Sequence, residues 1–171
     1  MIEPVVNYIR EKYRDETIGL IGTKQTVSSK VYANKIKNLN NNLKLNSLAT
    51  PLLVPMIEEG FLSGKISQDI INEYLNRPEL QEISALILGC THYPLIKNQV
   101  GRYYNDKIEV FDSSEIVAAS LKAYLEYNLL INQNQSATYE FLVSDYTQSF
   151  EELTKLFFGE LVHLEKFKLW E

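Results

Sequence analysis

Cysteine is scarce in this chain, because a single residue, Cys90, stands among 171. One thiol excludes an internal disulfide framework and a cysteine-rich zinc site. The two histidines, His92 and His163, lie far apart in sequence. We therefore expect no metal site.

Long apolar runs and an excess of basic residues are also missing. No segment approaches the roughly 18 consecutive apolar residues that a membrane-spanning helix requires. The first four residues, MIEP, lack the basic and apolar regions of a secretory signal. A net charge of -5 disfavours nucleic acid or an anionic membrane surface as the main partner. We expect a cytoplasmic protein that binds neither nucleic acid nor a membrane.

Short β-branched runs alternate with longer amphipathic stretches over the first two thirds of the chain. The runs predict strands at 17–21, 43–48, 85–89 and 108–111, and the stretches predict helices at 2–14, 27–36, around 53–57, 66–75 and 94–103. This alternation predicts an α/β fold, a doubly wound parallel sheet with helices on both faces.

The last third of the chain has a different character. Ser113 or Ser114 can cap a long helix, which a polar linker at 132–136 follows. A strand is then expected at 139–143, a helix at 149–158 ending at Gly159, and a half-exposed strand at 162–169.

Small and polar residues follow the predicted strands, where ligands bind in such folds. They are Thr23 after the first strand, Thr50 after the second, the Cys90 segment after the third, and Asp112 with Ser113 after the fourth. Turns and helix caps use the same residue types, so a binding role and a capping role both stay open.

Cys90 is the strongest candidate for chemistry. It is expected between a buried strand and a helix start, and Pro94 suits the first helical turn. Backbone N–H groups there would attract an anion and lower the thiol pKa toward neutrality. His92 could donate to the thiolate or shuttle its proton. The alternatives are a small buried cysteine and a histidine that completes a turn.

Other candidates have simpler structural explanations. Thr23 and Thr26 could hold a carboxylate, but capping of the next helix is the favoured explanation unless a ligand shares the site. Glu58 and Glu59 form an adjacent acidic pair, for which a solvated helix face is the default. Asp112 most simply caps the helix that follows it. His163 alternates with apolar residues, which favours a structural or solvent-facing role.

The segment around Cys90, residues 86–95 (LILGCTHYPL), resembles the second cysteine motif of bacterial glutamate racemases, in the aspartate/glutamate racemase family. Residues 18–23 (IGLIGT), 49–58 (ATPLLVPMIE) and 111–113 (FDS) resemble further family segments in the same order. The resemblance covers essentially the whole chain. One departure is Thr50, where the family usually has a non-catalytic cysteine.

The resemblance implies a racemisation of glutamate that uses two thiols and neither pyridoxal phosphate nor a metal. One thiolate removes the α-proton, and a second thiol delivers a proton to the opposite face. Cys90 would act from the L-glutamate side, assisted by His92, and Glu58 matches an acidic residue of the active site. Thr91, Thr23 and Thr26 match positions near the substrate. The implied partners are glutamate and a second copy of the chain, as a homodimer. The implied role is the supply of D-glutamate for peptidoglycan.

The family's DSGxGG and CNTAS segments, the second of which carries the other catalytic cysteine, have no counterpart here. The resemblance therefore divides the chain into residues 1–112, a second α/β domain, and residues 113–171, a C-terminal segment of an incomplete first domain. We expect the missing N-terminal portion to be needed for a complete site, and the chain to be inactive alone.

Three alternatives stay open. The chain could be an inactive remnant that serves as an interaction module, an aspartate racemase, or a thiol hydrolase on a related sheet. The hydrolase would need an acid that orients His92, and Glu58 is the candidate.

Overall fold

The computed structural model describes residues 2–39, 42–132 and 138–168. Its internal contacts divide the chain into two compact units, Met1–Asn128 and Leu129–Glu171. The first unit contains the parallel sheet, and the second contains a smaller one.

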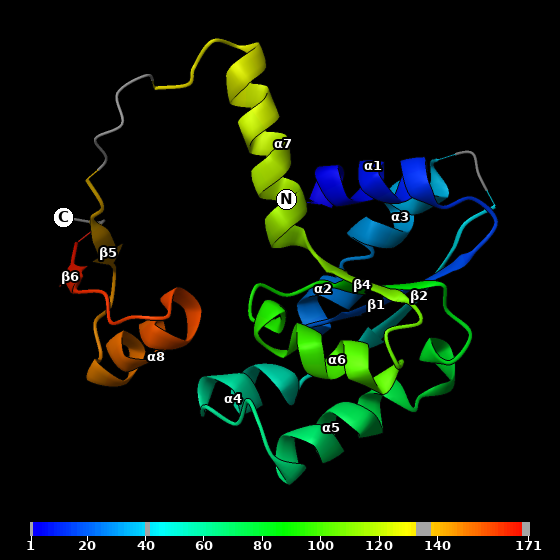
Figure 1. Ribbon diagram of the computed structural model, residues 1–171, viewed down its shortest axis with the longest axis horizontal. Coiled ribbons are helices and arrows are strands. Elements are labelled where there is room, and N and C mark those ends of the chain that lie inside the picture. Colours follow the sequence, from blue (N-terminus) through cyan, green and yellow to red (C-terminus); the bar gives the residue numbers. More distant parts are fainter. Residues whose placement is uncertain (1, 40–41, 133–137, 169–171) are drawn as a thin grey trace. The chain divides into compact units, whose positions relative to one another are not determined.

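The sheet of the first unit has four parallel strands in the order β2-β1-β3-β4 (Figure 1). They are β1 (Thr17–Gly22), β2 (Lys44–Ala49), β3 (Ala85–Leu88) and β4 (Glu109–Asp112). Every residue of β3 is buried, and so are five of the six residues of β1. A strand covered on both faces is favoured by a continuous apolar run, and both segments have one. The predicted α/β fold with a parallel sheet is confirmed.

Helices cover both faces of this sheet (Figure 1). On one face lie α1 (Ile2–Lys12) and α3 (Val31–Lys37), and on the other lie α4 (Leu53–Glu58), α5 (Lys65–Leu75) and α6 (Lys97–Tyr103). The unit also contains three short helices: α2 (Lys24–Ser28) and the 3-10 helices η1 (Pro78–Leu80) and η2 (Tyr93–Ile96). Each face has its own apolar core, and together the two cores fix the sheet in place.

Two predicted helices differ from the observed ones. The single helix expected at 27–36 is two helices, α2 and α3, because Lys30 has a left-handed backbone with φ 55. The helix expected at 94–103 begins as the 3-10 helix η2, and α6 follows it. Pro94 lies in the first turn of η2, as expected.

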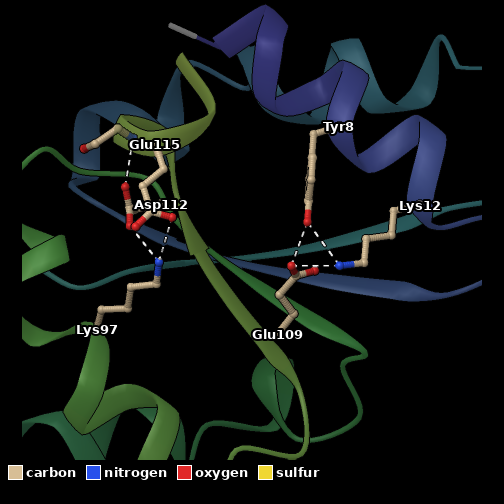
Figure 2. A network of polar contacts seen from close by, with 7 residues as sticks. Tyr8, Lys12, Lys97, Glu109, Asp112 and Glu115 are labelled. Carbon is tan, nitrogen blue, oxygen red and sulfur yellow. Dashed lines mark hydrogen bonds and ion pairs between the residues drawn. The ribbon is translucent and has the colours of Figure 1, made fainter. Parts of the chain in front are cut away.

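Two polar clusters tie the last strand to its neighbours (Figure 2). Glu109 of β4 accepts hydrogen bonds from Tyr8 at 2.7 Å and Lys12 at 2.8 Å, and a third from Tyr13. Asp112, which is 4% exposed, pairs with Lys97 of α6 at 3.1 Å. The first cluster anchors α1 to the sheet, and the second anchors α6 to the end of β4.

Helix α7 (Ser113–Tyr127) begins at Asp112, whose carboxylate accepts a hydrogen bond from the backbone N–H of Ser114 at 2.8 Å. The capping role expected of Asp112 is therefore confirmed, whereas Ser113 and Ser114, also named as possible caps, lie inside α7. Because α7 contacts α1, it belongs to the first compact unit, which extends past residue 112 to Asn128. The assignment of residues 1–112 and 113–171 to two racemase domains stays a prediction.

The second unit contains a parallel pair, β5 (Phe141–Val143) and β6 (Leu164–Lys166), and the helix α8 (Gln148–Phe158). Both strands are shorter than the ranges 139–143 and 162–169 expected for them, and residue 169 and most of the 132–136 linker lie outside the described residues. Gly159 ends α8 with a φ of 79, as expected. Several large apolar side chains of this unit are exposed: Tyr139, Leu142, Phe150, Phe157, Phe158, Leu161 and Phe167.

Within the described part of the chain, none of the helices has the length and apolar character needed to span a membrane.

Candidate functional site

The carboxyl ends of the four strands meet at one edge of the sheet. The strand register places Gly22 beside Ala49, Ile21 beside Leu88, and Leu88 beside Asp112. From β1 the chain turns to one side, to β2, and from β3 it turns to the other side, to β4. The gap between the ends of β1 and β3 is therefore the switch point of the sheet, where open α/β folds bind ligands. Cys90 lies there.

Gly89 allows the Cys90 segment to pass close to β1. A Cβ atom on Gly89 would lie 2.7 Å from Leu20 Cδ1 and 3.0 Å from Ile21 O. The N–H of Gly89 donates to that same Ile21 oxygen at 2.8 Å, and Gly89 O accepts a hydrogen bond from Thr26 Oγ1 at 3.4 Å. Because Gly89 has no side chain, the backbone can approach β1 closely enough for these hydrogen bonds, and Cys90 lies next to the end of β1.

Cys90, His92 and Glu58 form an array in which His92 contacts the other two side chains. Cys90 Sγ lies 3.7 Å from His92 Nδ1, and His92 Nε2 lies 3.1 Å from Glu58 Oε1. The His92 side chain is 26% exposed and that of Glu58 is 48% exposed. A carboxylate accepts but cannot donate, so Glu58 favours the tautomer with a proton on Nε2, in which Nδ1 is the acceptor that faces the thiol. The array can therefore move a proton between sulfur and imidazole.

Burial of Cys90 raises the pKa of its thiol above the ordinary value. The backbone N–H groups of His92 and Thr91 lower the pKa, whereas the charge of Glu58 raises it further. The prediction that the pKa of the Cys90 thiol falls toward neutrality is therefore wrong for this structure. The helix start that follows Cys90 is one short 3-10 turn, and its N–H groups do not offset the loss of solvent.

The three threonines lie on both sides of the switch point. Thr23 caps α2 by accepting a hydrogen bond from the N–H of Thr26 at 3.2 Å, which confirms the capping alternative. The two hydroxyl oxygens lie 3.0 Å apart. Thr91 is exposed, and its hydroxyl, like its N–H, interacts with the Cys90 sulfur. This geometry leaves both a structural and a ligand-binding role to Thr23 and Thr26.

Two side chains next to this array were not among the predicted site residues. Tyr93 is fully buried, and its hydroxyl lies 2.7 Å from that of Thr50, which is also fully buried. Tyr93 belongs to the LGCTHYP segment, and Thr50 follows the second strand. Their positions in sequence therefore indicate that both lie near the site, but no sequence pattern predicts that the two hydroxyl groups meet.

The remaining candidates lie elsewhere. His163 belongs to the second unit, is 84% exposed and lies 3.5 Å from Glu151, in keeping with a solvent-facing role. A cavity of about 590 Å³ lies between α1, β4 and α7, where Lys97, Glu109 and Asp112 contribute to its walls. Neither the array nor the three threonines line it. Among the described residues, no three His, Cys, Asp or Glu side chains form a group that could hold a metal ion.

The fold and the array define a class: an α/β protein with a thiol, an imidazole and a carboxylate at the switch point of a parallel sheet. Residues 1–121 match the model of one family, Asp/Glu/Hydantoin racemase. The chain therefore belongs to the Asp/Glu/Hydantoin racemase family.

Relatives agree with this assignment. A glutamate racemase of Chlorobaculum parvum is 39% identical over 143 residues, which are 83% of this chain and 53% of the relative. The solved structure of a Francisella tularensis glutamate racemase in complex with D-glutamate matches 97% of this chain and 62% of its own, with a TM-score of 0.86 and 35% identity. A Bacillus anthracis glutamate racemase matches 98% and 63%, with a TM-score of 0.89 and 25% identity. The chain thus spans between half and two thirds of the length of these proteins.

Proposed function

We propose that the chain provides one half of the active site of a cofactor-independent glutamate racemase, with Cys90 as one of two acid/base thiols. The observation that carries this proposal is the array of Cys90, His92 and Glu58 at the sheet's switch point, in a member of a racemase family. Relatives named as glutamate racemases support glutamate as the substrate.

The reaction needs no co-reactant. The Cys90 thiolate takes the α-proton of L-glutamate, so an S–H bond forms while the Cα–H bond breaks. The electron pair left on Cα is delocalised into the substrate carboxylate. A second thiol then gives its proton to the opposite face of Cα, which produces D-glutamate. Solvent exchange or the reverse reaction returns both thiols to their starting state.

His92 and Glu58 make this step possible at a buried thiol. Because burial favours the neutral S–H form of Cys90, a base must take the proton before catalysis. His92 Nδ1 is the nearest candidate, and the carboxylate of Glu58 compensates the charge that His92 then carries. In this proposal the hydroxyl and N–H of Thr91 contact the substrate, and Thr23 and Thr26 hold its carboxylate.

These 171 residues supply one thiol, so the second acid/base must come from polypeptide outside them. We therefore expect the chain alone to have little or no racemase activity, because it holds only half of a two-base site. The supply of D-glutamate for peptidoglycan, the cytoplasmic location and the homodimer stay predictions of the same kind.

A second candidate is favoured by one observation. A thiol hydrolase would need an acid beside His92, and Glu58 lies 3.1 Å from it. The same array would then activate Cys90 as a nucleophile rather than as a base. Family membership favours the racemase, and an ester substrate distinguishes the two.

The test uses two proteins: the 171-residue chain, and a completed protein in which the portion of the Chlorobaculum parvum glutamate racemase not covered by this chain is joined to it. Each receives L- and D-glutamate, L- and D-aspartate, and p-nitrophenyl acetate, and the products are separated by chiral chromatography. We expect the completed protein to interconvert the two glutamates, and the chain alone to be inactive.

Other results would replace the proposal. Turnover by the chain alone equal to that of the completed protein would refute the two-thiol site. Conversion of aspartate rather than glutamate would indicate an aspartate racemase, and ester cleavage that depends on Cys90 would indicate a hydrolase. A folded completed protein that turns over none of them would indicate an inactive interaction module.

A further inference from the structure

Thr50 and Tyr93 form a pair of hydroxyl groups inside the core beneath the site. Both residues are 0% exposed. Their hydroxyl oxygens lie 2.7 Å apart, so one hydroxyl donates to the other. Thr50 Oγ1 also lies 3.2 Å from Gly22 O, and Tyr93 OH lies 3.2 Å from Thr50 O, so the hydroxyl that accepts within the pair can donate to its carbonyl. Three strand ends are therefore connected: that of β1 through Gly22, that of β2 through Thr50, and that of β3 through the segment of Tyr93.

The pair joins the two segments that carry the catalytic array. Tyr93 directly follows His92, and its N–H donates to Cys90 O at 3.2 Å. Thr50 starts the segment that leads into α4, which ends at Glu58. The Tyr93 ring belongs to the same apolar cluster as Leu53, Met56 and Ile57 of α4. The distance from His92 to Glu58 thus depends on how these two segments are held together.

Neither hydroxyl is itself an acid or base of the reaction. Burial raises the pKa of Tyr93 to about 12, so its hydroxyl keeps its proton at neutral pH. Because both side chains are closed off from solvent, neither can contact a substrate. What the pair contributes is a fixed position.

We propose that the Thr50–Tyr93 hydroxyl pair is a positioning element that holds the Cys90 and His92 segment in register with Glu58. This inference rests on the proposed function for its catalytic meaning, whereas its structural content concerns the reactivity of Cys90 alone. The backbone N–H groups of Thr91 and His92 stabilise the Cys90 thiolate only while that turn keeps its shape. A looser turn directs these N–H groups away from the sulfur and leaves less thiolate at neutral pH.

The lone cysteine makes this measurable in the 171-residue chain as it stands, because an alkylating reagent can modify only one thiol. The rate of Cys90 alkylation by iodoacetamide is recorded from pH 6 to pH 10, together with a thermal unfolding curve for each variant. Thr50→Val and Tyr93→Phe each remove one hydroxyl and keep the size of the side chain. In both variants the hydroxyl that remains keeps a carbonyl acceptor, Gly22 O or Thr50 O, so we expect the fold to be retained.

In both variants we expect the alkylation rate at pH 7.5 to fall about fivefold, the usual effect of one buried hydrogen bond on a local equilibrium, and the pH profile to move to higher pH. Thr50→Ser should restore the profile. The double variant should equal each single one, since the two hydroxyls act through one contact. Tyr104→Phe is the matched control, because it removes a comparable bond, to Leu80 O at 3.1 Å, elsewhere in the same cluster.

An unchanged profile in folded Thr50→Val and Tyr93→Phe would overturn the inference. So would a lower unfolding temperature with unaltered alkylation, which is the signature of a purely structural pair, or an equal shift in Tyr104→Phe. The assay does not involve glutamate. A failed racemase assay with a shifted alkylation profile would therefore refute the proposed function and leave the positioning pair in place.

Discussion

Glu58→Gln should make Cys90 more reactive and racemisation slower. The Glu58 carboxylate has two effects in the structure: its charge raises the pKa of the Cys90 thiol, and its Oε1 holds His92 Nε2 at 3.1 Å. Glutamine keeps an acceptor oxygen and the size of the side chain but removes the charge. The pKa of Cys90 should therefore fall, while the charge that forms on His92 during proton transfer loses its compensation.

The two effects differ in size. The Glu58 side chain is 48% exposed, so solvent screens its action on the sulfur. A screened charge of this kind contributes about 0.5 kcal/mol, or about a twofold increase in thiolate at neutral pH. Proton transfer depends more strongly on the oriented imidazole, since a general acid or base contributes about 10²- to 10⁴-fold. We expect racemisation by the completed protein to fall by about tenfold or more.

The assay pairs iodoacetamide alkylation of the 171-residue chain with glutamate racemisation by the completed protein. Glu59→Gln is the matched control, because Glu59 is the C-cap residue of the same helix and forms no ion pair with another described residue. Alkylation that slows in Glu58→Gln would refute the sign of the charge effect. Racemisation that stays unchanged would refute the role of Glu58 in orienting His92.

Three further predictions concern residues outside the array. Glu109→Gln should cost about 2 kcal/mol in urea unfolding at pH 7. Burial raises the pKa of Glu109, but hydrogen bonds, among them that of Lys12, lower it by more. The stability that Glu109 contributes is therefore present above its unfolded-state pKa and is lost as pH falls through its folded-state pKa. The deficit should therefore shrink below about pH 4, and a deficit independent of pH would contradict this. Gly89→Ala should cost about 2 kcal/mol by overpacking against Leu20, and a wild-type urea midpoint would refute the close approach. Leu161→Glu, on the exposed apolar surface of the second unit, should reduce self-association measured by sedimentation velocity. An unchanged sedimentation coefficient would show that this surface does not mediate self-association.

The sheet of the first unit could be predicted because its strands are short, continuous apolar runs. The strand that ends at Leu88 is buried along its whole length, and the predicted strand boundaries agree with the observed ones within about two residues. The helix boundaries were less predictable. The break at Lys30 depends on a left-handed backbone, and lysine gives no signal for that conformation.

The site was predictable in position but not in its energetics. Strand ends pointed to Thr23 and Cys90, and the sequence named both His92 and Glu58, which the fold brings together. The pKa of Cys90 was not predictable, because burial depends on the packing of neighbouring segments. The contact between Thr50 and Tyr93 was equally hidden, since it joins residues 43 positions apart through their side chains.

The most direct test of the central claim follows the α-hydrogen of glutamate in D₂O, using the completed protein and its Cys90→Ala variant. Mass spectrometry measures deuterium at Cα in both enantiomers after incubation with L-glutamate. If Cys90 takes the α-proton of L-glutamate, the parent forms deuterated D-glutamate, and the variant loses this activity by about 10³-fold or more. Formation of deuterated D-glutamate at the parent rate in folded Cys90→Ala would contradict the account.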